Sequence, residues 1–198
     1  MLKMYIIAGC NGSGKTTASY TMLPELLECR EFVNSDEFAK SLSPFDPSAA
    51  SVSASRYMLM KIKYLLEKEQ NFAIETTLAT RSLAKIIKEA KQKGYHVTVI
   101  YFWLNSTTIA KERVQARVAA GGHNIPENVI ERRYYAGLKY LFDSYIRLCD
   151  RWVLADNSRI PFTVVAEGTE ALTFIKDNEK YRRIQNILKA YNDQHVSD

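Results

Sequence analysis

Apolar residues along the chain follow two alternating patterns, short continuous runs and stripes that repeat every three or four positions. Short runs bounded by turn residues are typical of buried strands, whereas stripes at about 3.6-residue spacing are typical of helices with one buried face. The strands predicted in this way span residues 4–8, 31–34, 72–75, 96–104, 151–155 and 162–167. Residues 96–104 are the longest β-rich run, which favours a central position in the sheet.

Helices are predicted between these strands and after the last of them. They span residues 15–23, 51–70, 82–93, 107–120, a segment that begins at Pro126, and a C-terminal segment at about 170–193. The first helix is expected to stop near Pro24, and Pro126 occupies the favoured first position of its own helix. The apolar stripe of that helix consists of Ile130, Tyr134, Leu138, Leu141, Tyr145 and Leu148.

Strands that alternate with helices predict an α/β fold, in which a mostly parallel sheet carries helices on both faces. The length of 198 residues suits a single domain that spans residues 1–198. Sheets of this type bind their ligands at the carboxyl ends of the strands. Reactive side chains are therefore most informative where a predicted strand ends.

The first predicted strand leads directly into a glycine-rich segment, residues 9–16, with the sequence GCNGSGKT. This segment matches the P-loop pattern GxxxxGK[ST] in full and precedes a predicted helix. Glycine lets the backbone wrap around a phosphate, and the helix N-terminus adds partial positive charge. The nucleotide-binding residues predicted here are Asn11, Gly12, Ser13, Gly14, Lys15, Thr16 and Thr17.

Two side chains of a P-loop have specific roles in binding a nucleotide. Lys15 can reach the β- and γ-phosphates, and the Thr16 hydroxyl can hold Mg²⁺. The alternative interpretation is a glycine-rich turn between strand and helix that binds no ligand.

Carboxylates follow the second and third predicted strands. Asp36, in the stretch VNSDEFA, can accept a proton from an acceptor hydroxyl or help to hold a metal ion. The alternative is that Asp36 only caps a helix that begins at Glu37. Glu75 and Thr77, in IETTL, bring another carboxylate and a hydroxyl to the same edge, or only cap the strand end.

Two other motif classes of P-loop proteins are absent from the sequence. No NKxD-type stretch that would read guanine is present, and no apolar run ends in paired acids as a Walker B strand does. These absences argue against a GTPase switch and against a motor, and they leave a kinase as the favoured class.

A lid is predicted at about residues 105–135, where arginines flank a glycine pair. Arg113 and Arg117 lie four residues apart on one predicted helix, so they share a face. Gly121-Gly122 and His123 follow, and Arg132-Arg133 lie on the next helix. Arginine binds phosphate oxygens in a forked geometry, which suits a segment that closes over a nucleotide. The alternative is a solvated helix pair whose arginines pair with Glu112 and Glu131.

Composition restricts the remaining possibilities. The net charge of +5 and the pI of about 9.0 favour anionic partners without distinguishing nucleic acid from a nucleotide or a sugar phosphate. The three cysteines form no CxxC pair, which favours free thiols in a reducing compartment. The histidines are far apart, so no zinc site is expected. No stretch is long enough to span a membrane, and we expect a cytoplasmic protein.

The order of these motifs is similar to that of the zeta-toxin-like P-loop kinases, and in particular of their small stand-alone branch labelled predicted ABC-type ATPase. The motifs that carry the resemblance are the P-loop, VNSDEFA, IETTL, RVQARVAAGGHNIPENVIERRY and DNS. The resemblance implies a three-layer P-loop kinase fold with ATP and Mg²⁺ as cofactors. It also implies phosphorylation of the 3′-hydroxyl of the amino sugar in UDP-N-acetylglucosamine, and an antitoxin that blocks the nucleotide site.

The resemblance also assigns roles to individual residues. It implies nucleotide and metal contacts for Lys15 and Thr16, and the general-base position for Asp36. The other positions that it matches are Glu75 and Thr77 for the acceptor, Arg113 for a phosphate clamp and Asn157 of DNS for the nucleotide.

The chain departs from the toxins at two places. Their second clamping arginine, just before the proline of the lid, is replaced here by Gly-Gly-His, so His123, Arg117 or Arg132 would have to substitute. The toxins also have an arginine soon after the acidic strand-end motif. The nearest arginine here is Arg81, which is slightly displaced along the sequence.

The sequence therefore predicts an ATP- and Mg²⁺-dependent phosphotransferase that acts on a small-molecule hydroxyl, in particular that of a nucleotide sugar. The alternatives are an ATPase without an organic acceptor, a kinase for nucleic-acid ends, and a non-catalytic nucleotide-binding subunit. An antitoxin is a predicted partner, and neither nucleic acid nor a membrane is.

Overall fold

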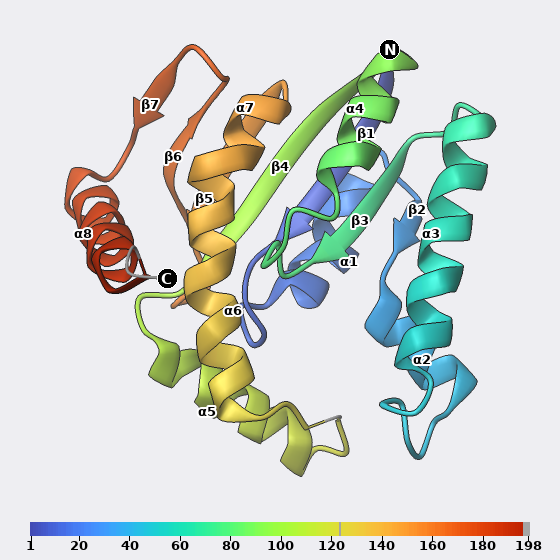
Figure 1. Ribbon diagram of the computed structural model, residues 1–198, viewed down its shortest axis with the longest axis horizontal. Coiled ribbons are helices and arrows are strands. Elements are labelled where there is room, and N and C mark those ends of the chain that lie inside the picture. Colours follow the sequence, from blue (N-terminus) through green and yellow to red (C-terminus); the bar gives the residue numbers. More distant parts are fainter. Residues whose placement is uncertain (123, 196–198) are drawn as a thin grey trace.

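The computed structural model describes residues 1–122 and 124–195, which form a central β-sheet with helices packed against it (Figure 1). The strands are β1 Leu2–Ala8, β2 Glu31–Val33, β3 Phe72–Thr76, β4 Tyr95–Trp103, β5 Arg151–Asp156, β6 Thr163–Gly168 and β7 Thr173–Ile175. Within the described residues they form a seven-stranded sheet in the order β2-β3-β1-β4-β5-β6-β7. The first six lie where the apolar runs predict them, whereas β7 is not predicted.

The sheet is mostly parallel, as predicted. β2, β3, β1, β4 and β5 run in the same direction, and β6 and β7 are antiparallel to their neighbours. The longest run forms β4, which is the middle strand, because its β-branched and aromatic residues fit a position that is buried on both faces. The carboxyl ends of the five parallel strands meet at one edge, and the glycine-rich segment lies there.

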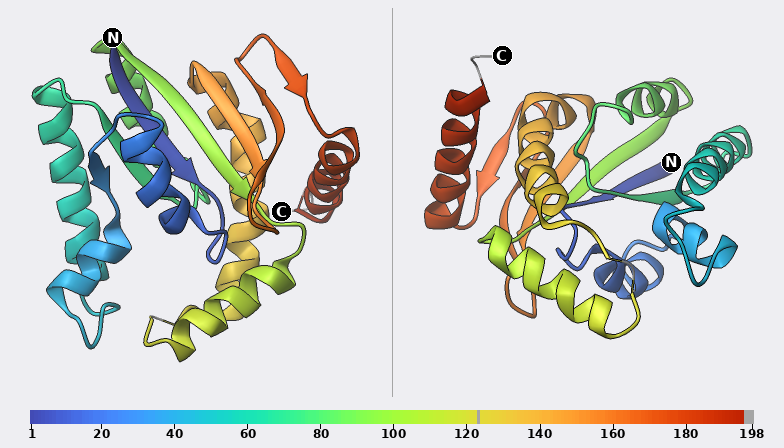
Figure 2. Two further views of the ribbon diagram at one scale, coloured as in Figure 1. Left: turned by 180° about the vertical axis from the view of Figure 1, so that it is seen from behind. Right: turned by 60° about the horizontal axis from the view of Figure 1, so that its bottom comes forward.

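Helices cover both faces of the sheet, which confirms the predicted α/β fold. They are α1 Lys15–Glu25, α2 Ser35–Leu42, α3 Ser51–Glu67, α4 Ala84–Gln92, α5 Thr107–Ala119, α6 Glu127–Tyr140, a π-helical turn η1 Leu141–Tyr145, α7 Ile146–Leu148 and α8 Asn178–His195. Figure 1 shows α3, α4 and α6 on one face, and the view from behind in Figure 2 shows α1 on the other.

The core divides into two clusters, one on each face of the sheet. The larger cluster packs residues such as Ile62 of α3, Ile87 of α4 and Leu138 of α6 against alternate positions of β1 and β4. The smaller cluster packs Met22 and Leu23 of α1 against the positions between them. The two-residue period of the strands thus sends successive side chains of one strand into different layers.

The C-terminal helix begins later than predicted, at Asn178 instead of about residue 170. The residues before it form β7, which pairs with β6 after a turn in which the Thr169 N–H donates to the Leu172 carbonyl at 2.9 Å. Thr173, Phe174 and Ile175 are β-branched or aromatic, so they favour a strand over a helix. The prediction was wrong because it extended the helical stripe of residues 181–191 back through this segment.

Two prolines lie close to helix termini. Pro24 is the last residue but one of α1, which ends at Glu25, so the helix stops near this proline as predicted. A proline next to the helix end removes only one hydrogen bond, and the freed carbonyl belongs to Tyr20, which is 62% exposed. Pro126 is the N-cap of α6 and precedes its first residue by one position.

Five residues of the apolar stripe after Pro126 are buried and Leu148 is partly buried, but the segment is not one regular helix. A π-helical turn at η1 separates α6 from α7. The Tyr145 hydroxyl of this turn donates to the Thr80 carbonyl at 2.6 Å. Tyr145 thereby connects this turn to the loop that follows β3.

All three cysteines, Cys10, Cys29 and Cys149, are buried and free. In the part of the chain that the structure describes, no helix has both the length and the apolar character needed to cross a membrane.

Candidate active site

The glycine-rich segment adopts a conformation that glycine alone accommodates easily. Gly12 and Gly14 have φ angles of 78° and 83°, in the left-handed region that residues with a Cβ rarely adopt. A Cβ at Gly12 would lie 2.5 Å from the Ala110 carbonyl oxygen, and one at Gly14 would collide with the Asn157 side chain. The segment forms a close turn around the N-terminus of α1, which is the cradle that an anionic phosphate fits.

Lys15 and Thr16 begin α1, and both side chains lie at this turn. The Lys15 ammonium donates to the Cys10 carbonyl at 2.9 Å, and the residue is only 7% exposed. No described carboxylate forms a salt bridge with Lys15, so its charge is available to a bound anion. A buried lysine in this position favours binding of a phosphate.

The Thr16 hydroxyl donates to the Glu75 carboxylate, with oxygen–oxygen distances of 2.9 and 3.0 Å. β1 pairs in parallel with β3, and this pairing aligns Ala8 with Thr76. The P-loop that follows β1 is thereby brought beside the end of β3, so that Thr16 lies next to Glu75. Because the hydroxyl hydrogen is directed at Glu75, the oxygen lone pairs of Thr16 remain available to a metal ion. Mg²⁺ needs only one or two protein oxygens beside waters and phosphates, so this donor set fits it.

Glu75 lies within a group of charges at the edge of the sheet. Burial raises the pKa of its carboxyl; Lys15 and the Thr16 hydrogen bond act in the opposite direction, and Asp36 and Glu37 add to the increase. The predicted gathering of Glu75 and Asp36 at one edge is therefore what the structure shows.

Asn34, and not Asp36, caps the helix that follows β2. Its side-chain oxygen accepts hydrogen bonds from the Asp36 and Glu37 backbone N–H groups, at 2.9 and 3.2 Å. The capping alternative for Asp36 is wrong, because α2 begins at Ser35 and places Asp36 in its first turn, with an exposed side chain. Asparagine is as good a cap as aspartate, so the sequence stretch itself did not separate the two residues.

Arg133 of α6 is a site residue that the sequence analysis did not single out. Its guanidinium donates to the Asn11 side-chain oxygen at 3.0 Å. Burial lowers the pKa of Arg133, the Asp36 carboxylate acts in the opposite direction, and Arg132 adds to the decrease. Arg133 therefore lies between the glycine-rich turn and Asp36.

A helical projection could have separated Arg133 from its neighbour. Arg133 follows Ile130 by three positions and precedes Gly137 by four, and both are buried, so it lies at the border of the buried face. Arg132 lies on the side of α6 opposite to its buried face and is exposed.

Arg113 joins three segments of the site. Its guanidinium donates to the carbonyl oxygens of Asn157 and Ser158 at 2.9 and 3.0 Å. The Asn157 side chain in turn donates to the Ser13 carbonyl at 2.7 Å. The loop after β5 is thereby held between α5 and the glycine-rich turn, and α5 is itself started by the Ser106 side chain, which accepts from the Ile109 N–H.

Residues 3–143 match the family model described as Zeta toxin. The chain belongs to this family. An uncharacterized protein of Haemophilus influenzae is 30% identical over 132 residues, which are 67% of this chain and 92% of that protein.

The solved structures that resemble the chain have the same fold at low sequence identity. The toxin–antitoxin system PezAT of Streptococcus pneumoniae matches with a TM-score of 0.63 and 14% identity, over 98% of this chain and 87% of that one. The AvrRxo1-ORF1:AvrRxo1-ORF2 complex matches with a TM-score of 0.74 and 17% identity. There the match covers 93% of this chain but only 63% of that chain, and a further structure of the complex contains ATP. Family membership and fold support a P-loop kinase-type phosphotransferase.

The structure shows the surroundings of several residues in the predicted lid. Glu131 pairs with Lys111 at 3.2 Å, so it is not an arginine partner. The Arg117 carbonyl accepts the Gly122 N–H at 2.9 Å, which closes the end of α5. His123 lies outside the described residues.

The remaining predicted residues lie at the border of the site. Arg81 is exposed and its guanidinium lies 5.6 Å from the centre of the Tyr140 ring. The Thr77 carbonyl packs closely against Gly137 of α6, and Thr17 is exposed on α1. The structure therefore does not bring Thr17, Arg81 or Arg132 into the hydrogen-bonded group around Glu75.

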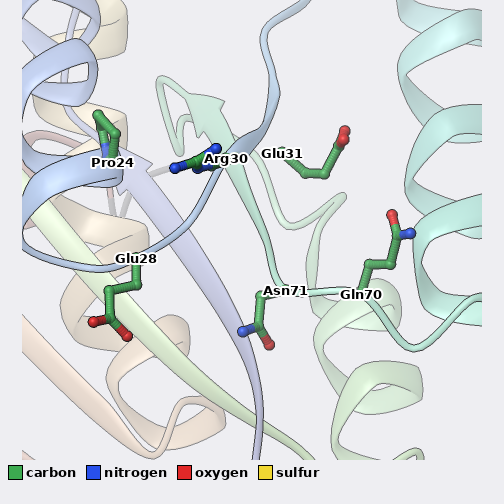
Figure 3. A pocket seen from close by; sticks show the side chains of 6 residues that line it. All are labelled: Pro24, Glu28, Arg30, Glu31, Gln70 and Asn71. Atoms are coloured by element: carbon green, nitrogen blue, oxygen red, sulfur yellow. The ribbon is translucent and has the colours of Figure 1, made fainter.

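A separate pocket of about 420 Å³ is lined by residues outside this group (Figure 3). Its lining residues are Pro24, Glu28, Arg30, Glu31, Gln70 and Asn71. Glu31 begins β2 and Asn71 precedes β3, so the pocket is at the amino ends of these strands. In a sheet of this class the ligands bind at the carboxyl ends, so we do not assign the reaction to this pocket.

Proposed function

We propose that the protein transfers the γ-phosphoryl group of ATP to a hydroxyl of a small molecule, namely a nucleotide sugar such as UDP-N-acetylglucosamine. The observation that carries the proposal is the hydrogen bond between Thr16 and Glu75, because it joins the nucleotide-binding turn to the strand end beside Asp36. A phosphate donor and an acceptor hydroxyl can meet there.

Each side chain has a separate task in this reaction. Lys15 neutralises charge on the β- and γ-phosphates, and Thr16 would hold Mg²⁺, which would offset negative charge on the phosphate oxygens. Asp36 accepts the proton of the attacking hydroxyl. A new oxygen–phosphorus bond forms, the bond to the bridging oxygen breaks, and ADP leaves.

Two arginines supply further positive charge in the proposed reaction. Arg113 is held beside the glycine-rich turn through Asn157, and residues 105–135 act as a lid that closes over the phosphates. Arg133 takes the place of the second clamping arginine, because its half-buried guanidinium lies between the turn and Asp36 without a described carboxylate as salt-bridge partner. A forked cation in that place suits the oxygens of the phosphoryl group in transfer.

The proposal is tested by measuring ADP formation with ATP and Mg²⁺ across a panel of nucleotide sugars. We expect turnover that depends on the acceptor, and a phosphorylated sugar as product. Turnover that no acceptor alters would support a plain ATPase, and salt-sensitive turnover on oligonucleotide ends would support a nucleic-acid kinase. Nucleotide binding without any turnover would support a non-catalytic subunit.

Arg133→Ala is expected to lower kcat by about 10²-fold and to leave ADP affinity near that of the wild type, because the lost charge acts on the transferred group. Arg147→Ala is the charge-matched control, since Arg147 is exposed on α7. Arg132→Ala tests the neighbouring arginine. If Arg132→Ala lowers kcat and Arg133→Ala does not, the assignment of Arg133 is wrong.

We further propose that the protein acts in the cytoplasm as a toxin with an antitoxin partner, as one of its structural neighbours belongs to a toxin–antitoxin system. Expression in bacteria should then arrest growth, and expression of the Lys15→Ala variant should not. Equal growth with the wild type and with the variant, at equal protein levels, would contradict a toxic role.

A further inference from the structure

The Asn34 side chain contacts both parts of the proposed site at once. Its amide nitrogen donates to a Glu75 carboxylate oxygen at 3.0 Å. Its oxygen accepts from the N–H groups of Asp36 and Glu37 at the start of α2. One amide therefore joins the end of β3 to the first turn of the helix that carries Asp36.

The Asp36 carboxylate depends on this connection for its position. It is exposed, and among residues 1–122 and 124–195 it has no hydrogen-bond or salt-bridge partner of its own. Its backbone N–H, in contrast, is bound to Asn34 at 2.9 Å. The place of the carboxylate is therefore determined by where Asn34 holds the helix terminus.

The same amide orients the carboxylate next to the P-loop. Glu75 accepts hydrogen bonds from the Thr16 hydroxyl and from the Asn34 amide, so neither oxygen rotates without the loss of a bond. Hydrogen bonds thus run without interruption from Thr16 through Glu75 and Asn34 to the backbone of Asp36.

Asparagine is suited to this task because it has a donor and an acceptor on one short side chain. Serine and aspartate also cap helices well, but serine is shorter and an ionised aspartate has no hydrogen to donate. Aspartate would also place a second carboxylate beside Glu75. The two functions of the residue can therefore be separated by substitution.

We infer that Asn34 is a positioning residue, which sets the distance between the nucleotide side of the site and the general base. The inference rests on the proposed phosphotransfer. Small displacements of a base or a phosphate cost large factors in rate, so this connection affects kcat more than it affects nucleotide binding.

The test compares Asn34→Asp with Asn34→Ala. Asn34→Asp retains the cap of α2 and removes the donor to Glu75. We expect kcat to fall by about tenfold or more, with ADP affinity and the thermal unfolding midpoint near those of the wild type. Asn34→Ala removes both contacts and should lower kcat and the unfolding midpoint together. Asn186→Asp makes the same chemical change at an exposed position on α8 and serves as the control.

A double variant supplies a readout that a purely structural role would not produce. In Asn34→Asp/Glu75→Gln the donor and acceptor are exchanged, so the hydrogen bond can form in the opposite direction. We expect the kcat of this double variant to be higher than the value obtained by multiplying the two single-variant effects. Independent, multiplicative effects would overturn the inference, as would an Asn34→Asp variant with wild-type kcat.

The outcome can be separated from failure of the proposed function. If the wild type transfers phosphate and the Asn34 variants behave as the wild type does, only the positioning role fails. If the wild type transfers phosphate to no acceptor, the proposed function fails. In that case, hydrogen exchange at the Asp36 and Glu37 amides tests the capping contact of Asn34, on which the connection depends. Faster exchange in Asn34→Ala than in Asn34→Asp supports it, and equal rates overturn it.

Discussion

Phosphate transfer is expected to disappear in the Lys15→Ala variant. The ammonium group is buried beside the N-terminus of α1 and forms no salt bridge with a described carboxylate, so its positive charge is available to a bound anion. Without it, charge that develops on the β- and γ-phosphates is opposed only by the metal and the arginines. The rate should fall by at least about 10³-fold, as when other central cations of phosphoryl transfer are removed. Product formation measures the loss of phosphate transfer, and titration with ATP measures any loss of nucleotide affinity.

Lys85→Ala is the matched control, because Lys85 is an exposed lysine of α4. It should retain wild-type turnover and wild-type ATP affinity. Thermal unfolding of both variants shows whether Lys15→Ala remains folded. If folded Lys15→Ala protein turns over at the wild-type rate, the glycine-rich turn does not bind the transferred phosphate.

The Asp36→Asn variant should remain folded and bind ATP, but transfer phosphate roughly 10²- to 10⁴-fold more slowly. The amide has nearly the size of the carboxylate but cannot accept the hydroxyl proton. The capping of α2 should be unaffected, because Asn34 supplies it. Single-turnover measurements with saturating ATP and acceptor isolate the chemical step from binding.

Glu37→Gln is the control for this substitution. Glu37 is the next carboxylate of the same helix turn and forms a salt bridge with Lys40 at 2.7 Å. The control should stay within a few-fold of wild type. Wild-type turnover in Asp36→Asn would mean that Asp36 is an ordinary surface residue of α2. Loss of ATP binding in the presence of Mg²⁺ would instead mean that Asp36 holds the metal ion.

The local sequence determined the parts of this protein that depend on short-range physics. An apolar run, glycines at positive φ and a lysine-threonine pair define the turn before α1, whatever packs against it later. The alternation of strands with helices determined a parallel sheet, and a parallel sheet brings its carboxyl ends to one edge. That is why Glu75 and Asp36 could be assigned to one place before any contact was known.

Only the tertiary structure decided which side chains meet across that edge. Arg133 reaches Asn11 across 122 positions of the chain, and the choice between it and Arg132 depends on which face of α6 is buried. Asn34 and Asp36 are equally good caps by residue type, and the Glu75 carboxylate, 41 positions after Asn34, lies where the amide can reach it. Short-range preferences do not distinguish such neighbours. Packing distinguishes them, because a buried cation or carboxylate is stable only where the surrounding elements supply a partner.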